Sequence, residues 1–101
     1  MYKLKYLSLA QKDLNDIIDY IVDIIKEPKA ALDLVDLLDG SILRLQQFPY
    51  ACRVYQSIEL LQLEYRMLIV KNYLVFYVVN EDVVEIHRII YAKMDITKII
   101  R

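Results

Sequence analysis

The sequence is poor in the residues that interrupt or cross-link a chain. Its 101 residues include one glycine, two prolines, one cysteine and no tryptophan. A glycine-rich phosphate loop and a proline- or glycine-rich linker are therefore excluded. The single cysteine, Cys52, leaves no internal disulfide and no cysteine-based metal cluster, which fits a reducing cytoplasm.

Long apolar runs are also missing. No stretch approaches the roughly 20 apolar residues that cross a bilayer, and the N-terminal MYKLKYLSLAQKD lacks the pattern of a signal peptide. We therefore expect a cytoplasmic chain that does not enter a membrane and uses no metal, cofactor or small-molecule ligand. At this length we expect one domain, residues 1–101.

The net charge is only −1, but the charges are segregated along the chain. Residues 8–47 hold eight acidic and four basic side chains, whereas the rest of the chain holds six acidic and nine basic ones. A strongly basic nucleic-acid-binding protein would have a different distribution. The apolar content is high, at 57%, which predicts apolar surface that a partner covers.

The hydrophobic pattern changes period along the chain. Residues 2–7, YKLKYL, alternate as a strand with one exposed side. Apolar residues then recur at helical spacing over 8–27 and again over 28–48, which predicts an antiparallel helical hairpin. Ser8 followed by Gln11 predicts a capping box, and Pro28 suits the first turn of the second helix.

The second half of the chain is rich in β-branched and aromatic residues. After a loop at 48–60, this composition predicts strands at 62–71, 73–79 and 83–91, joined by short turns. A short helix at 94–101 follows, with Asp95 as its cap. The predicted fold is α+β: an N-terminal strand, a helical hairpin that covers one face of the sheet, a three-stranded antiparallel meander and a short C-terminal helix.

The face of the sheet away from the hairpin is predicted to be apolar as well. Strict alternation places Leu74, Phe76 and Val78 together on one face of the middle strand, opposite a second apolar set. In the last strand the same rule separates two sets, Val84, Ile86, Arg88 and Ile90 against Val83, Glu85, His87, Ile89 and Tyr91. One helical layer cannot cover both faces, so we expect the C-terminal helix and a partner to cover the second.

The last strand also carries the reactive side chains. His87 is the only histidine and is a candidate general acid or base. The alternative is a histidine at the sheet surface, paired with Glu85 or with a neighbouring strand. Arg88 is a candidate for binding a phosphate, but pairing with a carboxylate of a partner or with Asp95 is the favoured alternative.

Arg66 and Tyr91 complete the set of catalytic candidates. Arg66 and Lys71 are five residues apart in one strand and so point to opposite faces, and we expect Arg66 on the open face. Tyr91 follows His87 by four residues on the same face, at roughly 13 Å, so both could line one groove. The alternative for Tyr91 is an aromatic cover over the core.

This order of elements and these residues resemble the RelE/ParE family of toxins from bacterial toxin–antitoxin modules. The likeness is carried by LAQKDLNDIIDYI at 9–21, YRMLIVKNYLVFYVV at 65–79 and VEIHRIIYAKMD at 84–95, and it covers nearly the whole chain. The resemblance implies a small sheet with a helical hairpin on one face and a cognate antitoxin that wraps the other. The contacts expected for the antitoxin are Leu68, Leu74, Phe76, Val78 and Lys93.

The resemblance offers two targets. ParE-like members poison DNA gyrase, whereas RelE-like members cut messenger RNA in the ribosomal A site without a metal ion. Cleavage needs a base, cations beside the phosphate and an acid, and the candidates here are Arg66, His87, Arg88 and Tyr91. Leu68 and Leu74 stand where RelE-like enzymes have basic residues, and KMD at 93–95 is similar to the ParE branch.

A gyrase-directed growth inhibitor is therefore the favoured hypothesis. A ribosome-dependent mRNA endonuclease is the first alternative. A catalytically inert corepressor that only binds the antitoxin is the second.

Overall fold

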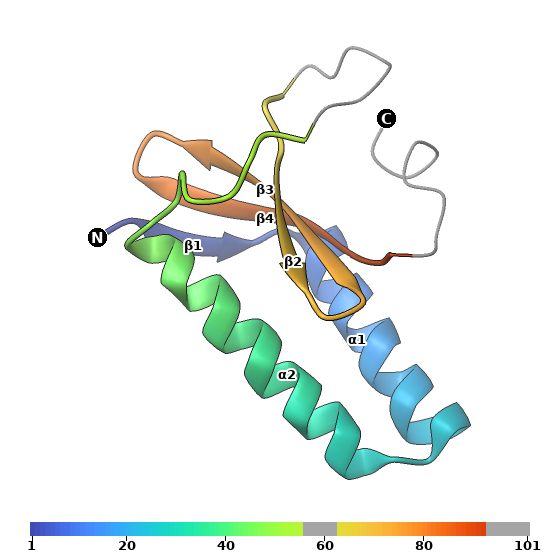
Figure 1. Ribbon diagram of the computed structural model, residues 1–101. Coiled ribbons are helices and arrows are strands. Elements are labelled where there is room, and N and C mark those ends of the chain that lie inside the picture. The colour runs from blue at the N-terminus through green and yellow to red at the C-terminus, as the bar shows by residue number, and fades with distance from the viewer. Residues whose placement is uncertain (56–62, 93–101) are drawn as a thin grey trace.

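The computed structural model describes residues 1–55 and 63–92. Over these residues the predicted α+β order is confirmed, with a strand, a helical hairpin and a three-stranded meander following one another (Figure 1). The helix predicted at 94–101 lies outside the described residues. Within the described part of the chain, no helix combines the length and apolar character needed to cross a membrane.

The sheet has four strands in the order β1-β4-β3-β2. β1 (Lys3–Tyr6) lies parallel to β4 (Val83–Tyr91). β3 (Tyr73–Asn80) is antiparallel to β4 on one side and to β2 (Arg66–Val70) on the other. The first strand of the chain is thus placed beside the last, and β3 and β4 form the centre of the sheet.

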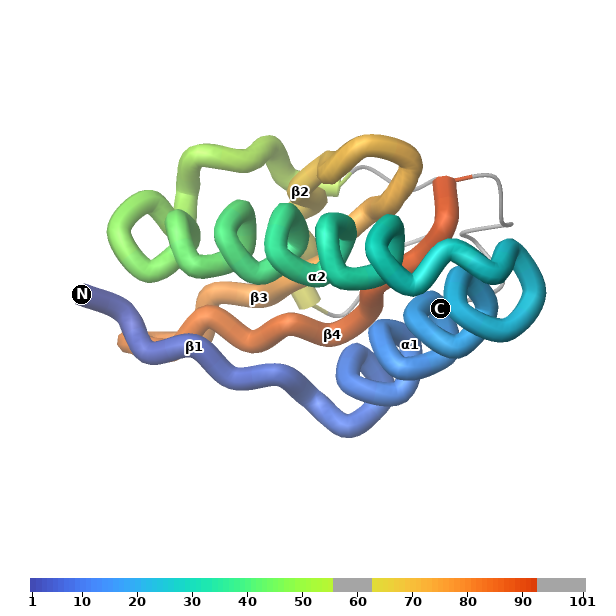
Figure 2. The backbone as a smooth tube through the Cα atoms, turned by 90° about the horizontal axis from the view of Figure 1, so that it is seen from below, coloured from blue at the N-terminus to red at the C-terminus, as the bar shows by residue number. Residues whose placement is uncertain are grey.

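Two helices form a hairpin on one side of the sheet (Figures 1 and 2). The hairpin comprises α1 (Ser8–Asp19), a π-helical segment η1 (Tyr20–Ile25) and α2 (Pro28–Leu43), which runs into a short 3-10 helix η2 (Arg44–Gln46). The helix predicted over 8–27 therefore widens after Asp19. It ends at Lys26, whose φ of 62° is left-handed.

The two helix starts were predicted with different success. Pro28 lies in the first turn of α2, as expected. Backbone N–H groups in the first turn have no acceptor within the helix, so the N–H that proline lacks costs no hydrogen bond there. The capping box at the start of α1 is wrong, because Leu7 is the N-cap and no side chain caps the helix. Ser8 is already helical, and the Gln11 N–H donates to the Leu7 carbonyl oxygen at 3.0 Å.

The main core lies between the hairpin and the helix-covered face of the sheet. Its buried residues come from both helices, from η2 and from the three strands of the meander: Ala10, Leu14, Leu38, Ile42, Leu45, Val70, Val75, Tyr77, Val84, Ile86 and Ile89. Apolar residues at helical spacing meet apolar residues at strand spacing here, which is the packing that the sequence pattern predicts.

A β-bulge interrupts the pairing of the two central strands. Tyr77 pairs with Ile86 and the preceding Phe76 pairs with Arg88, so His87 is an extra residue in β4. An extra residue shifts the alternation of side chains beyond it. As a result Ile86 and Ile89 both lie in the main core, whereas strict alternation had predicted them on opposite faces.

Candidate functional site

The face of the sheet away from the helices, the second face, is not an open apolar surface. Leu74, Phe76 and Ile90 form a separate buried cluster there. Three half-buried side chains from the preceding segment and from β2 pack against this cluster, namely Tyr55, Tyr65 and Met67. The Tyr55 ring meets the Phe76 ring edge-on, with 5.2 Å between the ring centroids.

Backbone pairing holds this cover in place. Val54 bridges to Arg66 at the outer edge of β2, and the Tyr55 N–H donates to the Tyr65 carbonyl oxygen at 2.7 Å. The chain before β2 therefore folds back along its edge and over the second face.

The residues predicted to contact the antitoxin do not form one free surface in the described chain. Leu74, Phe76 and Val78 are at most 8% exposed, so they are not the free surface that alternation suggested. Leu68 is half-buried on the helix-covered face, because it pairs with the core residue Val75. Lys93 lies outside the described residues.

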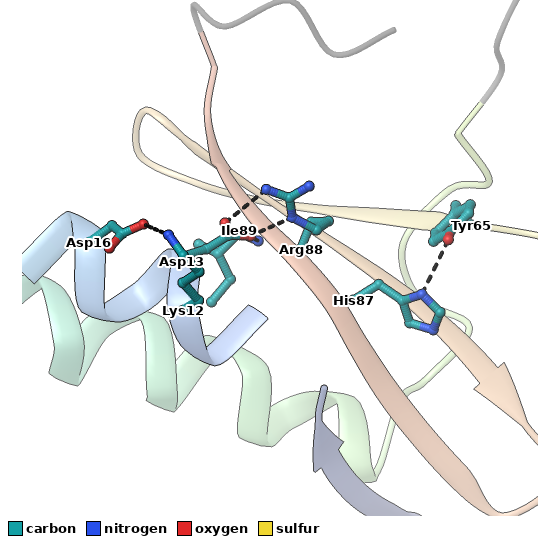
Figure 3. Close-up of polar contacts among 7 residues, drawn as sticks. All are labelled: Lys12, Asp13, Asp16, Tyr65, His87, Arg88 and Ile89. Carbon is teal, nitrogen blue, oxygen red and sulfur yellow. Dashed lines mark hydrogen bonds and ion pairs between the residues drawn. The ribbon is translucent and has the colours of Figure 1, made fainter. Parts of the chain in front are cut away.

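His87 lies on the second face between two polar partners, Tyr65 and Glu85. Figure 3 shows its hydrogen bond with Tyr65. Its Nδ1 is 3.1 Å from the Tyr65 hydroxyl, and its Nε2 is 3.3 Å from a Glu85 carboxylate oxygen. The imidazole is only 15% exposed. The surface pairing with Glu85 that was considered for His87 is thus present, and both ring nitrogens already have partners.

Arg88 is held by α1 rather than by a free anion (Figure 3). Its guanidinium donates two hydrogen bonds to the two carboxylate oxygens of Asp13, at 2.7 and 2.9 Å. The same carboxylate accepts the backbone N–H of Ile89 at 3.0 Å. The hydrogen bond to Asp13 raises the pKa of Arg88 above its usual value. The expected pairing of Arg88 is present, but its partner is Asp13.

Arg66 is on the helix-covered face, contrary to expectation. It pairs with the core residue Tyr77, and its guanidinium donates to the Cys52 carbonyl oxygen at 2.7 Å and to Glu64 at 3.2 Å. Its Cζ lies 4.9 Å from the centroid of the Tyr50 ring. These contacts fix Arg66 against the loop that follows α2.

Tyr91 is also on the helix-covered face, because the bulge reverses the alternation after His87. Its ring centroid lies 5.6 Å from that of Tyr73. The expectation that His87 and Tyr91 line one groove is therefore wrong. Sequence reasoning passed over one signal, the polar pair His87–Arg88 between Ile86 and Ile89, which is the spacing that a bulge produces.

Tyr91 instead lines a hollow of about 570 Å³ between the hairpin and one end of the sheet. We call this hollow the tyrosine groove. Its lining comes from α1, η1, the β2–β3 turn, β3 and β4: Asp16, Ile17, Tyr20, Ile21, Ile25, Asn72, Tyr73 and Tyr91. Sequence reasoning missed it because each of these residues fits a helix or strand pattern that is explained without a groove.

A smaller hollow of about 310 Å³ lies between the end of α2 and β2. Cys52, Leu68 and Phe48 are among its lining residues. In the described ranges, 1–55 and 63–92, no three histidine, cysteine or acidic side chains are arranged to hold a metal ion.

The four catalytic candidates are not brought together. The side chains of His87 and Arg88 leave β4 on the second face, whereas those of Arg66 and Tyr91 lie on the helix-covered face. The arrangement provides an ion pair, a histidine between two hydrogen-bond partners and an apolar groove. Within residues 1–55 and 63–92, these four side chains do not form the convergent acid, base and cations of an RNA-cleaving centre.

Comparison with known proteins agrees with the fold. Residues 4–96 match the family described as the ParE toxin of the type II toxin–antitoxin system, parDE. The fold is similar to a solved structure of the chromosomal ParDE toxin–antitoxin system from P. aeruginosa, with a TM-score of 0.76, 24% sequence identity, 92% of this chain covered and 98% of that chain covered. No curated protein sequence is similar enough to count as a match. Because the family match spans nearly all of the sequence, the chain belongs to the ParE toxin family of type II toxin–antitoxin systems.

Proposed function

We propose that the chain inhibits growth by acting on DNA gyrase and that a cognate antitoxin neutralises it by binding. Membership of the ParE family supports the toxin role. The name of the similar P. aeruginosa system, which pairs a toxin with an antitoxin, supports the partner.

The separation of the four catalytic candidates is the observation that favours gyrase over messenger RNA as the target. A metal-independent nuclease needs a base, an acid and cations within hydrogen-bonding reach of one phosphodiester. Here the candidates belong to two faces of the sheet, Arg88 is engaged by Asp13, and both nitrogens of His87 have partners. In the part of the chain that the structure describes, these four candidates do not converge.

The proposal is tested with the purified chain in two parallel reactions. DNA supercoiling by gyrase is measured in one, and cleavage of ribosome-bound messenger RNA is mapped in the other. We expect inhibition of supercoiling and intact RNA. RNA cuts at the ribosomal A site, with supercoiling unaffected, would instead support the endonuclease.

The variant His87→Gln sharpens the comparison. Glutamine can keep a hydrogen bond but cannot transfer a proton as imidazole does. We expect gyrase inhibition within about twofold of the original chain, because no step of the proposed function uses His87. Loss of growth inhibition by a correctly folded His87→Gln variant would contradict the proposal. Normal growth when the unaltered chain is produced alone would point to the inert corepressor.

A further inference from the structure

We propose that the tyrosine groove receives a protein segment that places one arginine side chain against the tyrosines and aliphatic side chains against the isoleucines. The inference rests on the proposed function, since the antitoxin is the partner that would supply this segment. It moves the expected contact from the second face of the sheet to the groove beside the hairpin.

The aromatic wall of the groove is suited to a planar cation. The centroids of the Tyr73 and Tyr91 rings lie 5.6 Å apart, and the ring planes are inclined at 59°. Tyr20 lines the same groove. Burial raises the pKa of the Tyr73 hydroxyl, with further contributions from Tyr91 and Tyr20. Tyrosine faces attract guanidinium groups, and arginine is the commonest protein cation found there.

The groove also offers a carboxylate. Asp16 is part of its lining, and in the free chain it accepts a hydrogen bond from Lys12 at 2.8 Å. That pair is exposed on both sides, so it holds the two side chains together only weakly. A guanidinium entering the groove can therefore replace Lys12 as the partner of Asp16, with the added geometry of a bidentate contact.

Apart from Asn72, the rest of the lining is aliphatic and at least partly accessible. Ile17 and Ile21 continue the wall along the hairpin, and Ile25 is 50% exposed. The neighbouring Ile24 is 66% exposed and Tyr20 is 56% exposed. An apolar strip with an aromatic end is the kind of surface on which binding energy concentrates in protein interfaces.

Charge decides what kind of segment fits. The stretch 8–47, which contains the whole hairpin, carries eight acidic and four basic side chains. The hairpin of a second copy would carry charge of the same sign, and a nucleic acid would bring phosphates, so both are disfavoured beside Asp16. A segment with basic and aliphatic residues matches the groove in charge and in polarity.

The test uses a defined probe, a 16-residue helix-forming peptide with leucines along one face and arginines beside them. Two matched peptides carry citrulline or glutamate in place of arginine. Binding is measured by fluorescence anisotropy. We expect the citrulline peptide to bind about tenfold more weakly than the arginine peptide, and the glutamate peptide to show no measurable binding. Equal binding of the arginine and citrulline peptides would overturn the proposal.

Two tyrosines provide a matched pair of variants. Tyr20 lines the groove and is 56% exposed, whereas Tyr50 lies outside it and is 57% exposed. Tyr20→Leu keeps an apolar side chain but removes the ring, and we expect it to weaken the arginine peptide about fivefold to tenfold. Tyr50→Leu should leave the affinity unchanged. Equal effects of the two substitutions would show that the peptide binds elsewhere on the acidic hairpin and would overturn the assignment.

These outcomes are separable from those of the proposed function. If the chain does not inhibit gyrase but binds the arginine peptide with the dependence on Tyr20, the proposed function fails and the ligand preference of the groove stands. If the chain inhibits gyrase while peptide binding depends neither on arginine nor on Tyr20, the groove proposal fails and the proposed function stands.

Discussion

Asp13 connects three groups with one carboxylate. It accepts two hydrogen bonds from the Arg88 guanidinium and one from the Ile89 backbone N–H. β1 pairs with β4 only from Val83 to Ile86, so beyond that point Asp13 provides the acceptor that a neighbouring strand would have offered.

Removing the Asp13 carboxylate should lower the stability of the fold. Asp13→Ala leaves a half-buried guanidinium without its partner, and we expect a loss of about 3 kcal/mol in the free energy of unfolding. Chemical denaturation at neutral pH measures this. Asp16→Ala removes a carboxylate from an exposed pair with Lys12 on the same helix, and it should change stability by less than about 0.5 kcal/mol. Similar losses for both variants would contradict the role given to Asp13.

Two tyrosines of the core, the half-buried Tyr6 and the fully buried Tyr77, predict how stability responds to alkaline pH. Burial raises the pKa of Tyr6 and of Tyr77 well above the usual range, and the Asp39 carboxylate adds to the effect at Tyr6. A raised pKa means that the folded state holds its proton more tightly than the unfolded state. The stabilisation is therefore complete below about pH 10 and is lost progressively as the pH rises above it.

Urea denaturation between pH 7 and pH 11.5 tests this expectation. The free energy of unfolding should fall above pH 10, and the fall should be shallower in Tyr6→Phe, which has no hydroxyl to ionise. Tyr6→Phe should also be about 1 kcal/mol less stable at pH 7, because it lacks the 3.2 Å hydrogen bond to Asp39. An unchanged slope in this variant would contradict the assignment.

At the scale of elements, α2 contains a residue that weakens it. Gly40 lies in the last turns of α2 and is exposed, and a Cβ added there would meet nothing within 4 Å. Gly40→Ala should therefore stabilise the chain by about 0.5–1 kcal/mol, since alanine loses less backbone entropy in a helix. The increase should appear as a higher midpoint of thermal unfolding with unchanged binding of the arginine peptide. A lower midpoint would mean that the added Cβ meets a neighbouring atom, which would contradict the open space seen at Gly40.

The helices and strands were predictable because their causes are local. Apolar residues at helical or alternating spacing gave the hairpin and the meander, and β4 was predicted with its observed bounds, 83–91. The bulge at His87 was not predicted, because it depends on how β4 pairs with β3. This extra residue places Tyr91 on the opposite face of the sheet from His87. The two side chains therefore cannot line one groove, as had been expected.

The candidate site was less predictable for the same reason. Burial on the second face depends on the segment before β2, which had appeared to be a surface loop without a period. Arg66 also binds the Cys52 carbonyl oxygen, and 75 residues separate Arg88 from its partner Asp13. Pairings between such distant segments leave no trace in a local pattern.

At the scale of the whole molecule, Tyr55 acts as a cover over the second face. Its ring packs edge-on against Phe76, which is fully buried. Tyr55→Ala should expose part of this cluster and lower the free energy of unfolding by about 2 kcal/mol, which denaturation measures. It should also increase the fluorescence of a dye that binds apolar surface. The control is Phe48→Ala, because Phe48 is 62% exposed and its loss should change neither quantity.

The position of β4 has a consequence for biosynthesis. Because β4 lies between β1 and β3, β1 has no partner in the sheet until the ribosome has made nearly the whole chain. Contacts between such distant segments form late and slowly. We therefore expect copies released before β4 is made to leave β1 unpaired and to be more open to proteases than finished molecules.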